Sequence, residues 1–179
     1  MSPDYKLPFT PEFLKKLMEG EHVTLRAVLG SCPGMFERDE GKYYFEPPIG
    51  TEIVACRSGR VVEIDKTPLE EIRKLSHVQL HNLNLVLVDH GDGTYINYLH
   101  IDSKLKKGDR VNQGENLGNL IRGSQKYDPH LHLHFHNSPN DKKFNRFAFF
   151  SDLTFSNSDF SHWSYLGKIP NRSKVVRFA

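Results

Sequence analysis

Four histidines alternate along one short segment of the chain, residues 128–139, with the sequence DPHLHLHFHNSP. They are His130, His132, His134 and His136. Because the side chains of a β-strand point alternately to its two faces, a strand here puts all four imidazoles on one face and the three intervening apolar side chains on the other. Same-face neighbours on a strand lie about 7 Å apart, so adjacent rings can converge on one small volume.

This row of imidazoles has the composition of a metal-binding or proton-transfer site. Four charged rings so close together would repel one another, so several should be neutral near pH 7. Neutral imidazole is the form that binds metal ions and accepts protons. His100 closes another predicted strand and can be aimed at the same pocket. A solvated polar face is the alternative, and it suits His136 at the strand end best.

The histidine strand needs neighbouring strands, and the sequence predicts them from residue 52 onward. Residues 52–65, EIVACRSGRVVEID, have the pattern of two strands joined by a bend. Residues 84–101, NLVLVDHGDGTYINYLHI, indicate a strand, a tight turn at residues 91–93 and a returning strand. Residues 105–121 place glycines among polar residues, as β-turns and short strands do.

Two short helices complete the predicted elements. Residues 10–20, TPEFLKKLMEG, have a capping threonine and a proline at the start and a glycine at the end. Residues 67–75, TPLEEIRKL, indicate a second helix inserted between strands. We therefore predict a mainly β protein, with a single antiparallel β-sheet or β-sandwich-like core and short peripheral helices.

Composition limits the classes of function. The chain has 179 residues, of which 37% are hydrophobic and 26% charged, and a net charge of +2, which is too balanced to indicate nucleic-acid binding. No segment approaches the roughly 20 apolar residues of a transmembrane helix, and the first residues lack the pattern of a secretory signal. Cys32 and Cys56 allow either one disulfide or two thiols.

Four segments, in order, resemble the lysostaphin/LytM-type zinc metallo-endopeptidases, which cut peptidoglycan cross-bridges. The segments are PPIGTEIVACRSGRVVEI, NLVLVDHGDGTYINYLHI, LKKGDRVNQGENLGNL and PHLHLHF. The resemblance covers about residues 44–155. It implies a peptidase-like β-domain at residues 40–155, preceded by a helix-and-loop extension at residues 1–39 and followed by a wrapping tail at residues 156–179.

The resemblance also implies roles for individual residues. With Pro129 fixing the register, His130 matches the family's catalytic base or transition-state donor, and His132 matches a zinc ligand. His100 matches the Tyr-x-His histidine that assists the activated water and the developing oxyanion. His134 is expected to contact substrate. A zinc ion held by three protein ligands keeps a position for water and lowers the pKa of that water.

The remaining ligand positions depart from the family pattern. The family places His-x-x-x-Asp just before Pro-x-Gly-Thr, and counting back from PPIGT puts Glu40 and Tyr44 in those two positions. Glu40 can bind zinc through oxygen, whereas Tyr44 is protonated at neutral pH because the pKa of a phenol is about 10. We therefore expect Tyr44 to contact substrate rather than metal. Other oxygen donors nearby are Glu37, Asp39 and Glu46.

Three functions follow from this pattern. In the first, the domain has lost its metal and binds peptidoglycan peptides or a cell-wall protein partner. In the second, it is an active zinc metallo-endopeptidase with a rebuilt metal site. In the third, it is a β-barrel that binds a metal or a small ligand and resembles the family only in architecture. Residues 106–118 are also similar to turns of biotinyl and lipoyl carrier domains. The resemblance implies a cell-envelope or extracellular location, although no secretory signal is recognisable.

Overall fold

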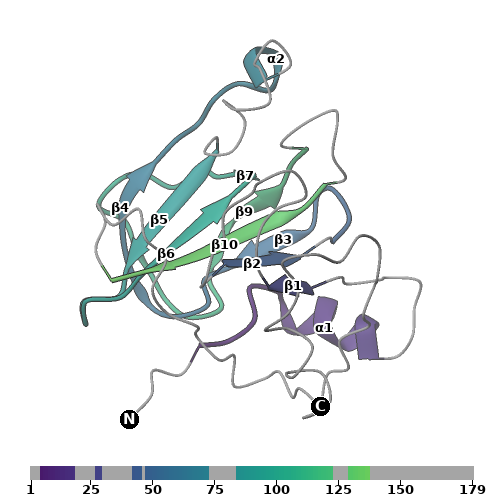
Figure 1. Cartoon of the computed structure of the whole chain (residues 1–179), viewed down its shortest axis with the longest axis horizontal. Coiled ribbons are helices and arrows are strands. Elements are labelled where there is room, and N and C mark those ends of the chain that lie inside the picture. Colours follow the sequence, from purple (N-terminus) through teal and green to yellow (C-terminus); the bar gives the residue numbers. More distant parts are fainter. Residues whose placement is uncertain are drawn as a thin grey trace.

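Two antiparallel β-sheets form the body of the protein in the computed structural model (Figure 1). The structure describes residues 5–18, 27–29, 42–45, 47–72, 84–122 and 129–137. The strands are β1 (Ala27–Leu29), β2 (Lys42–Phe45), β3 (Glu52–Val54), β4 (Gly59–Ile64), β5 (Leu85–Asp89), β6 (Tyr95–Leu99), β7 (Ile101–Asp102), β8 (Arg110–Val111), β9 (Asn116–Leu120) and β10 (Leu131–His136). The predicted mainly β, antiparallel fold is confirmed.

The larger sheet has the strand order β1-β2-β10-β6-β5-β4-β8, and the smaller sheet has the order β3-β9-β7. The histidine-bearing strand β10 is therefore an inner strand, paired with β2 on one side and β6 on the other. Strands β5 and β6 form the predicted hairpin and pair from Leu85↔Leu99 to Asp89↔Tyr95. The strand that carries the candidate site is thus held by backbone hydrogen bonds along both edges.

The main hydrophobic core joins the two sheets. Alternation along the strands sends one face of the larger sheet into this core, where the apolar side chains are almost fully buried. Its members from the larger sheet include Val61, Val86, Val88, Ile96, Tyr98, Leu131, Leu133 and Phe135, and those from the smaller sheet include Ile53, Ile101, Leu117 and Leu120. The predicted apolar face of the histidine strand is part of this core.

The N-terminal segment packs on the same core. Leu7 and Phe9 are buried, and Phe9 forms a β-bridge with Ile53. The helix α1 (Pro11–Met18) follows, and its first turn is capped because the amide of Phe13 donates to Thr10 Oγ1 at 3.2 Å. The helix predicted within residues 10–20 is confirmed over Pro11–Met18, and residues 19–20 lie outside the described part. The shorter helix α2 (Leu69–Ile72) lies within the segment predicted to be helical, whose residues 73–75 lie outside the described part.

The β5–β6 turn is stabilised by Asp92. Gly91 and Gly93 adopt φ of 75° and 82°, as a tight turn requires. Asp92 accepts hydrogen bonds from Thr94 and contacts Arg57 at 2.5 Å. Burial alone would raise the pKa of Asp92, but the hydrogen bonds from Thr94 and Arg57 lower it to about 2. This cluster ties the hairpin tip to the β3–β4 connection.

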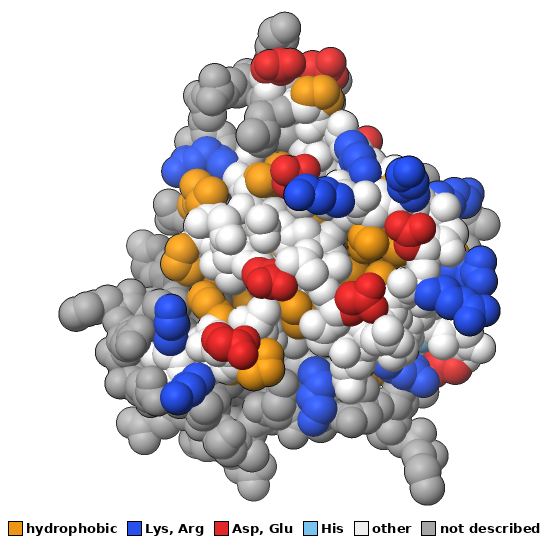
Figure 2. All heavy atoms as spheres, turned by 180° about the vertical axis from the view of Figure 1, so that it is seen from behind, with side chains coloured by type: hydrophobic (Ala, Val, Ile, Leu, Met, Phe, Trp, Pro, Cys, Tyr) orange, Lys and Arg blue, Asp and Glu red, His pale blue; other side chains and the backbone are white. Residues whose placement is uncertain are grey.

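The described surface carries charges of both signs. Figure 2 shows acidic and basic side chains interspersed on the face opposite to that of Figure 1. Within the described residues, neither helix has the length and apolar run of a membrane span. Cys56 is buried, whereas Cys32 lies outside the described residues.

Candidate metal and catalytic site

The polar face of β10 is as deeply buried as its apolar face. His132, His134 and His136 are 2%, 6% and 7% exposed. His130 comes just before the strand begins at Leu131 and is partly buried. The predicted alternation of imidazole and apolar side chains is confirmed, but these imidazoles form no exposed polar face. Three of the four imidazoles of this face are thus enclosed by the protein.

His100 occupies the corner where the chain passes from the larger sheet into the smaller one. It follows β6 of the larger sheet and precedes β7 of the smaller sheet. Its φ is 68°, a left-handed conformation that costs a non-glycine residue roughly 1–2 kcal/mol. The amide of Ile121 donates to the His100 carbonyl at 2.9 Å and helps to hold this corner. Such strained positions are often found at functional sites.

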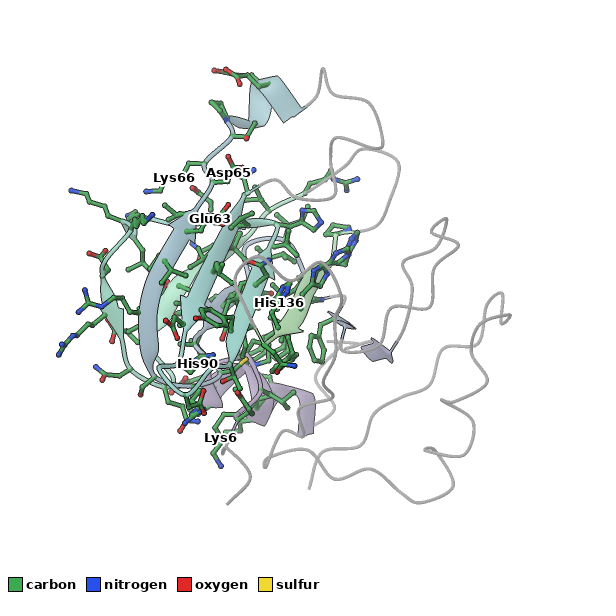
Figure 3. The ribbon with its side chains drawn as sticks, turned by 60° about the vertical axis from the view of Figure 1, so that its left-hand side comes forward. Lys6, Glu63, Asp65, Lys66, His90 and His136 are labelled. Carbon is green, nitrogen blue, oxygen red and sulfur yellow. The ribbon has the colours of Figure 1, made fainter. Side chains whose placement is uncertain are left out.

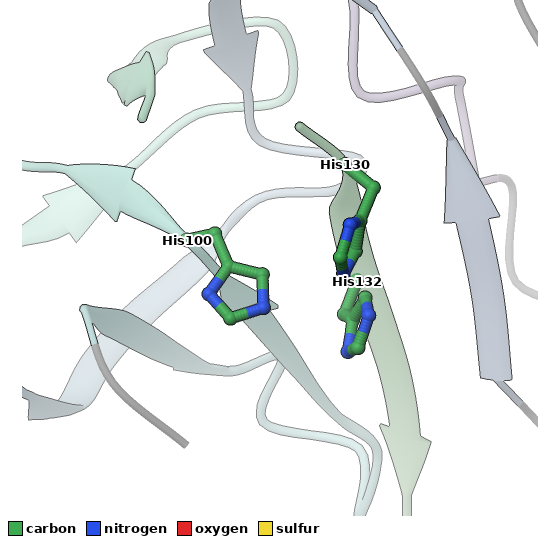
Figure 4. A group of neighbouring side chains, drawn as sticks. All are labelled: His100, His130 and His132. Carbon is green, nitrogen blue, oxygen red and sulfur yellow. The ribbon is translucent and has the colours of Figure 1, made fainter. Parts of the chain in front are cut away.

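The corner brings His100 against the start of β10 (Figure 4). The ring centroid of His100 lies 5.1 Å from that of His130 and 4.9 Å from that of His132. His130 and His132 are stacked, with centroids 4.4 Å apart and planes inclined by 29°. One ring nitrogen from each of the three residues lies within 4.8 Å of the other two. Nδ1 of His100 and Nε2 of His132 are shielded from solvent.

This arrangement can perform two kinds of chemistry. Three convergent imidazoles are a ligand set for a transition metal ion. Closely packed rings of this kind can also transfer protons to and from a bound substrate. The structure therefore brings together His100, His130 and His132, the three histidines to which the family resemblance assigns catalytic or metal-binding roles.

The row of imidazoles continues beyond this group. The ring of His134 lies 5.6 Å from that of His132, and the ring of His136 lies 6.3 Å from that of His134. Asn97 of β6 is directly opposite His134, and its Nδ2 lies 3.3 Å from Nε2 of His136. Sequence reasoning did not single out Asn97, because its place beside the row depends on the β6–β10 register.

The structure describes only one of the candidate site residues that precede β3 in the sequence. Tyr44 lies in β2, and the register places it directly opposite His132. Glu40 lies outside the described residues, as do Glu37, Asp39 and Glu46. The register therefore places the backbone of Tyr44 beside that of His132.

His90 belongs to another part of the molecule. It lies at the end of the larger sheet where the N-terminal segment packs, and Figure 3 shows it there with Lys6, whereas Asp65 lies at the opposite end. Its Nδ1 is 2.9 Å from the carbonyl oxygen of Ser58. Burial is the main cause that lowers the pKa of His90.

Comparison with known proteins decides the family. A model described as "Peptidase family M23" matches residues 40–146, which is more than half of the chain. The chain belongs to peptidase family M23. This M23 chain is 35% identical over 103 residues to the peptidoglycan DD-endopeptidase ShyC of Vibrio cholerae. The match covers 57% of this chain and 21% of ShyC, so the chain spans about a fifth of the length of that relative.

Solved structures share the fold of this M23 chain. The solution structure of lysostaphin matches with a TM-score of 0.51 and 19% identity, covering 99% of this chain and 60% of the other. The catalytic domain of a point mutant of the prophage-encoded M23 protein EnpA from Enterococcus faecalis matches with a TM-score of 0.50 and 20% identity, covering 68% and 86%. At these identities the matches show the fold alone.

The metal of the family can be tested against the residues of this M23 domain. M23 peptidases are generally zinc-dependent. Position 44, which the resemblance assigns to an aspartate ligand, is a tyrosine directly opposite His132. A protonated phenol is a poor zinc ligand at neutral pH. Tyr44 therefore does not fit the aspartate position that the resemblance implies.

Proposed function

We propose that this M23 domain binds the peptide part of peptidoglycan, a stem or cross-bridge peptide, without hydrolysing it through the zinc set of its family. The observation that carries this proposal is Tyr44 opposite His132. With that position occupied by a phenol, the family scheme retains His132 and, at most, the carboxylate of Glu40. Catalytic zinc sites in proteins use three protein ligands and keep one position for water, so two are too few.

The proposal that the bound molecule is a peptidoglycan peptide is based on the similar proteins. ShyC is by name a peptidoglycan endopeptidase, and the sequence match to it extends over more than half of this chain. Along β10, His134 continues the row of imidazoles beside the three-histidine group. We assign His134 and Tyr44 to peptide binding. A cell-wall protein presenting a similar peptide is the other partner that this site would accept, and a cell-envelope or extracellular location follows from either.

Co-sedimentation with purified peptidoglycan sacculi tests the binding proposal. The protein is incubated with sacculi in the presence of a chelator, the sacculi are pelleted, and the bound fraction is measured. We expect wild type to sediment with the sacculi and His134→Ala to bind about tenfold more weakly. His90→Gln serves as the matched control, because His90 lies away from the site. Failure of the wild-type protein to sediment at any concentration would refute the proposal.

A second candidate function is an active zinc endopeptidase with a rebuilt metal site. The observation that favours it is the convergence of His100, His130 and His132, since a domain that had lost all chemistry would not need three packed imidazoles. This candidate predicts that wild type with added zinc releases soluble peptides from sacculi and that His130→Ala does not. If wild type with added zinc released no soluble peptides, this candidate function would be refuted.

A further inference from the structure

We propose that Asp65 and Asn84 are positioning residues, which hold the imidazole of His100 against the start of β10 through the backbone. Neither residue belongs to the group formed by His100, His130 and His132. The proposal concerns the placement of His100 in the protein without ligand. It is therefore independent of whether the domain binds peptidoglycan peptides or cleaves them, and it can be tested separately from the proposed function.

Asn84 and His100 lie side by side where two strands leave the larger sheet. The pairing of β5 with β6 ends at Leu85↔Leu99, so the next residues along the two strands are Asn84 and His100. Their φ angles are 53° and 68°, and among the described residues they are the only non-glycine residues with a positive φ. Such backbone conformations persist only where the surrounding contacts hold them. The two left-handed residues therefore indicate that one set of contacts shapes this corner.

The peptide bond between His100 and Ile101 is held at both of its polar groups. Its amide, which belongs to Ile101, donates to the carbonyl oxygen of Asn84 at 3.1 Å. Its carbonyl oxygen, which belongs to His100, accepts the amide of Ile121 at 2.9 Å. Because the peptide group is planar, its orientation sets the ψ angle of His100. Asn84 on one side and Ile121 on the other thus fix the backbone from which the His100 ring projects.

Asp65 holds Asn84 in its place. The amide of Asn84 donates to Oδ2 of Asp65 at 2.8 Å, and the Thr67 hydroxyl donates to the same oxygen at 3.0 Å. The amide of Asp65 donates to the first carbonyl oxygen of β5 at 2.9 Å, which anchors Asp65 on that strand. Asn84 is 5% exposed, so its amide needs an acceptor within the protein, and a carboxylate is a strong one. Hydrogen bonds therefore lead from Asp65, just after β4, through Asn84 to the peptide bond that follows His100.

Asn84 acts through its backbone, so its side chain matters only because it must permit the left-handed conformation. Asparagine adopts this conformation more readily than most residues, and glycine adopts it without strain. A β-branched residue such as valine is strained there. Asn84→Gly should therefore preserve the position of His100, whereas Asn84→Val should not. Asp65→Ala should act like the valine variant, because the amide of Asn84 loses its acceptor.

NMR of the protein without ligand tests the proposal directly. The ring centroid of His100 lies 5.1 Å from that of His130 and 4.9 Å from that of His132, so wild type should give NOE cross-peaks between these rings (Figure 4). We expect Asn84→Gly to retain the cross-peaks, and Asn84→Val and Asp65→Ala to lose them. Circular dichroism of each variant checks that it folds.

Hydrogen exchange gives a second measurement with a milder variant. Relative to the amide of the fully buried Val86, the amide of Ile101 should exchange about tenfold faster in Asp65→Asn than in wild type, because a neutral oxygen is the weaker acceptor. Tyr98→Phe is the matched control, because it removes a buried hydrogen bond from the strand before His100 without touching these contacts, and it should retain the cross-peaks.

Three results would overturn the proposal. The first is retention of the cross-peaks in Asp65→Ala, and the second is unchanged relative exchange of the Ile101 amide in Asp65→Asn. The third is loss of the cross-peaks in Asn84→Gly, because the side chain of Asn84 rather than its backbone would then hold His100. None of these measurements uses sacculi, so failure of sacculus binding would refute the proposed function and leave this proposal to the NMR results.

Discussion

Replacing Tyr98 with phenylalanine should weaken the strand that leads to His100. Tyr98 and Cys56 are both fully buried, and the amide of Cys56 donates to the Tyr98 hydroxyl at 2.8 Å. Phenylalanine keeps the ring volume, so the substitution removes this hydrogen bond without leaving a large cavity. Burying an amide without its acceptor costs about 1–3 kcal/mol. We therefore expect Tyr98→Phe to lower the free energy of unfolding by about 2 kcal/mol.

Urea and thermal unfolding measure this effect. A loss of about 2 kcal/mol should lower Tm by about 4–8 °C in a chain of this size and shift the urea midpoint while leaving the m-value unchanged. Tyr95→Phe is the matched control, because Tyr95 lies on the same strand and its hydroxyl makes no hydrogen bond within the described part of the chain. This control substitution should change the free energy of unfolding by less than about 0.5 kcal/mol. Equal stabilities of the two variants would refute the role of the Tyr98 hydroxyl.

Three further predictions concern stability and pH. Gly118→Ala should cost at least about 2 kcal/mol in urea unfolding, because the new Cβ would lie 2.4 Å from the carbonyl oxygen of Asp102 and the φ of Gly118 is 149°. The pKa of Asp92 is lowered to about 2, so its contribution to the free energy of unfolding is complete above about pH 4 and is lost as the pH falls toward 2. After solvent screening this contribution amounts to about 0.5–1 kcal/mol. The variant Asp92→Asn should abolish that part of the pH dependence. The pKa of His90 is lowered by burial, so the unfolded state binds the proton more readily and stability should decrease as the pH falls below about 6.5; a wild-type slope in this range equal to that of His90→Gln would contradict this.

The parts of the fold that depend on local pattern could be predicted from the sequence. The period-two alternation of residues 131–136 indicated a strand with an apolar face, and that face lies in the core. The turn glycines between two apolar runs indicated the β5–β6 hairpin. The starting signals of residues 10–20 indicated the helix that begins at Pro11. Each of these signals acts over a few residues, so neighbouring sequence suffices to detect it.

The features that depend on long-range pairing could not be predicted in the same way. The chain changes sheets at His100 through a positive φ, which no local preference of histidine requires. The position of β10 between β2 and β6, and with it the placement of Asn97 beside the histidine row, follows from registers between segments far apart in sequence. The family resemblance predicted that His100 lies close to His130 and His132. The sequence pattern by itself showed only that such an approach was possible.

Restoring the ligand set of the family tests the central claim most directly. The double variant Glu40→His/Tyr44→Asp recreates the His-x-x-x-Asp pattern that the resemblance describes. Soluble peptides released from purified sacculi are measured by chromatography for this variant and for wild type, each with added zinc. We predict release by the variant and none by wild type, because the family zinc set is incomplete in the natural chain. Release of peptides by wild type would contradict the account.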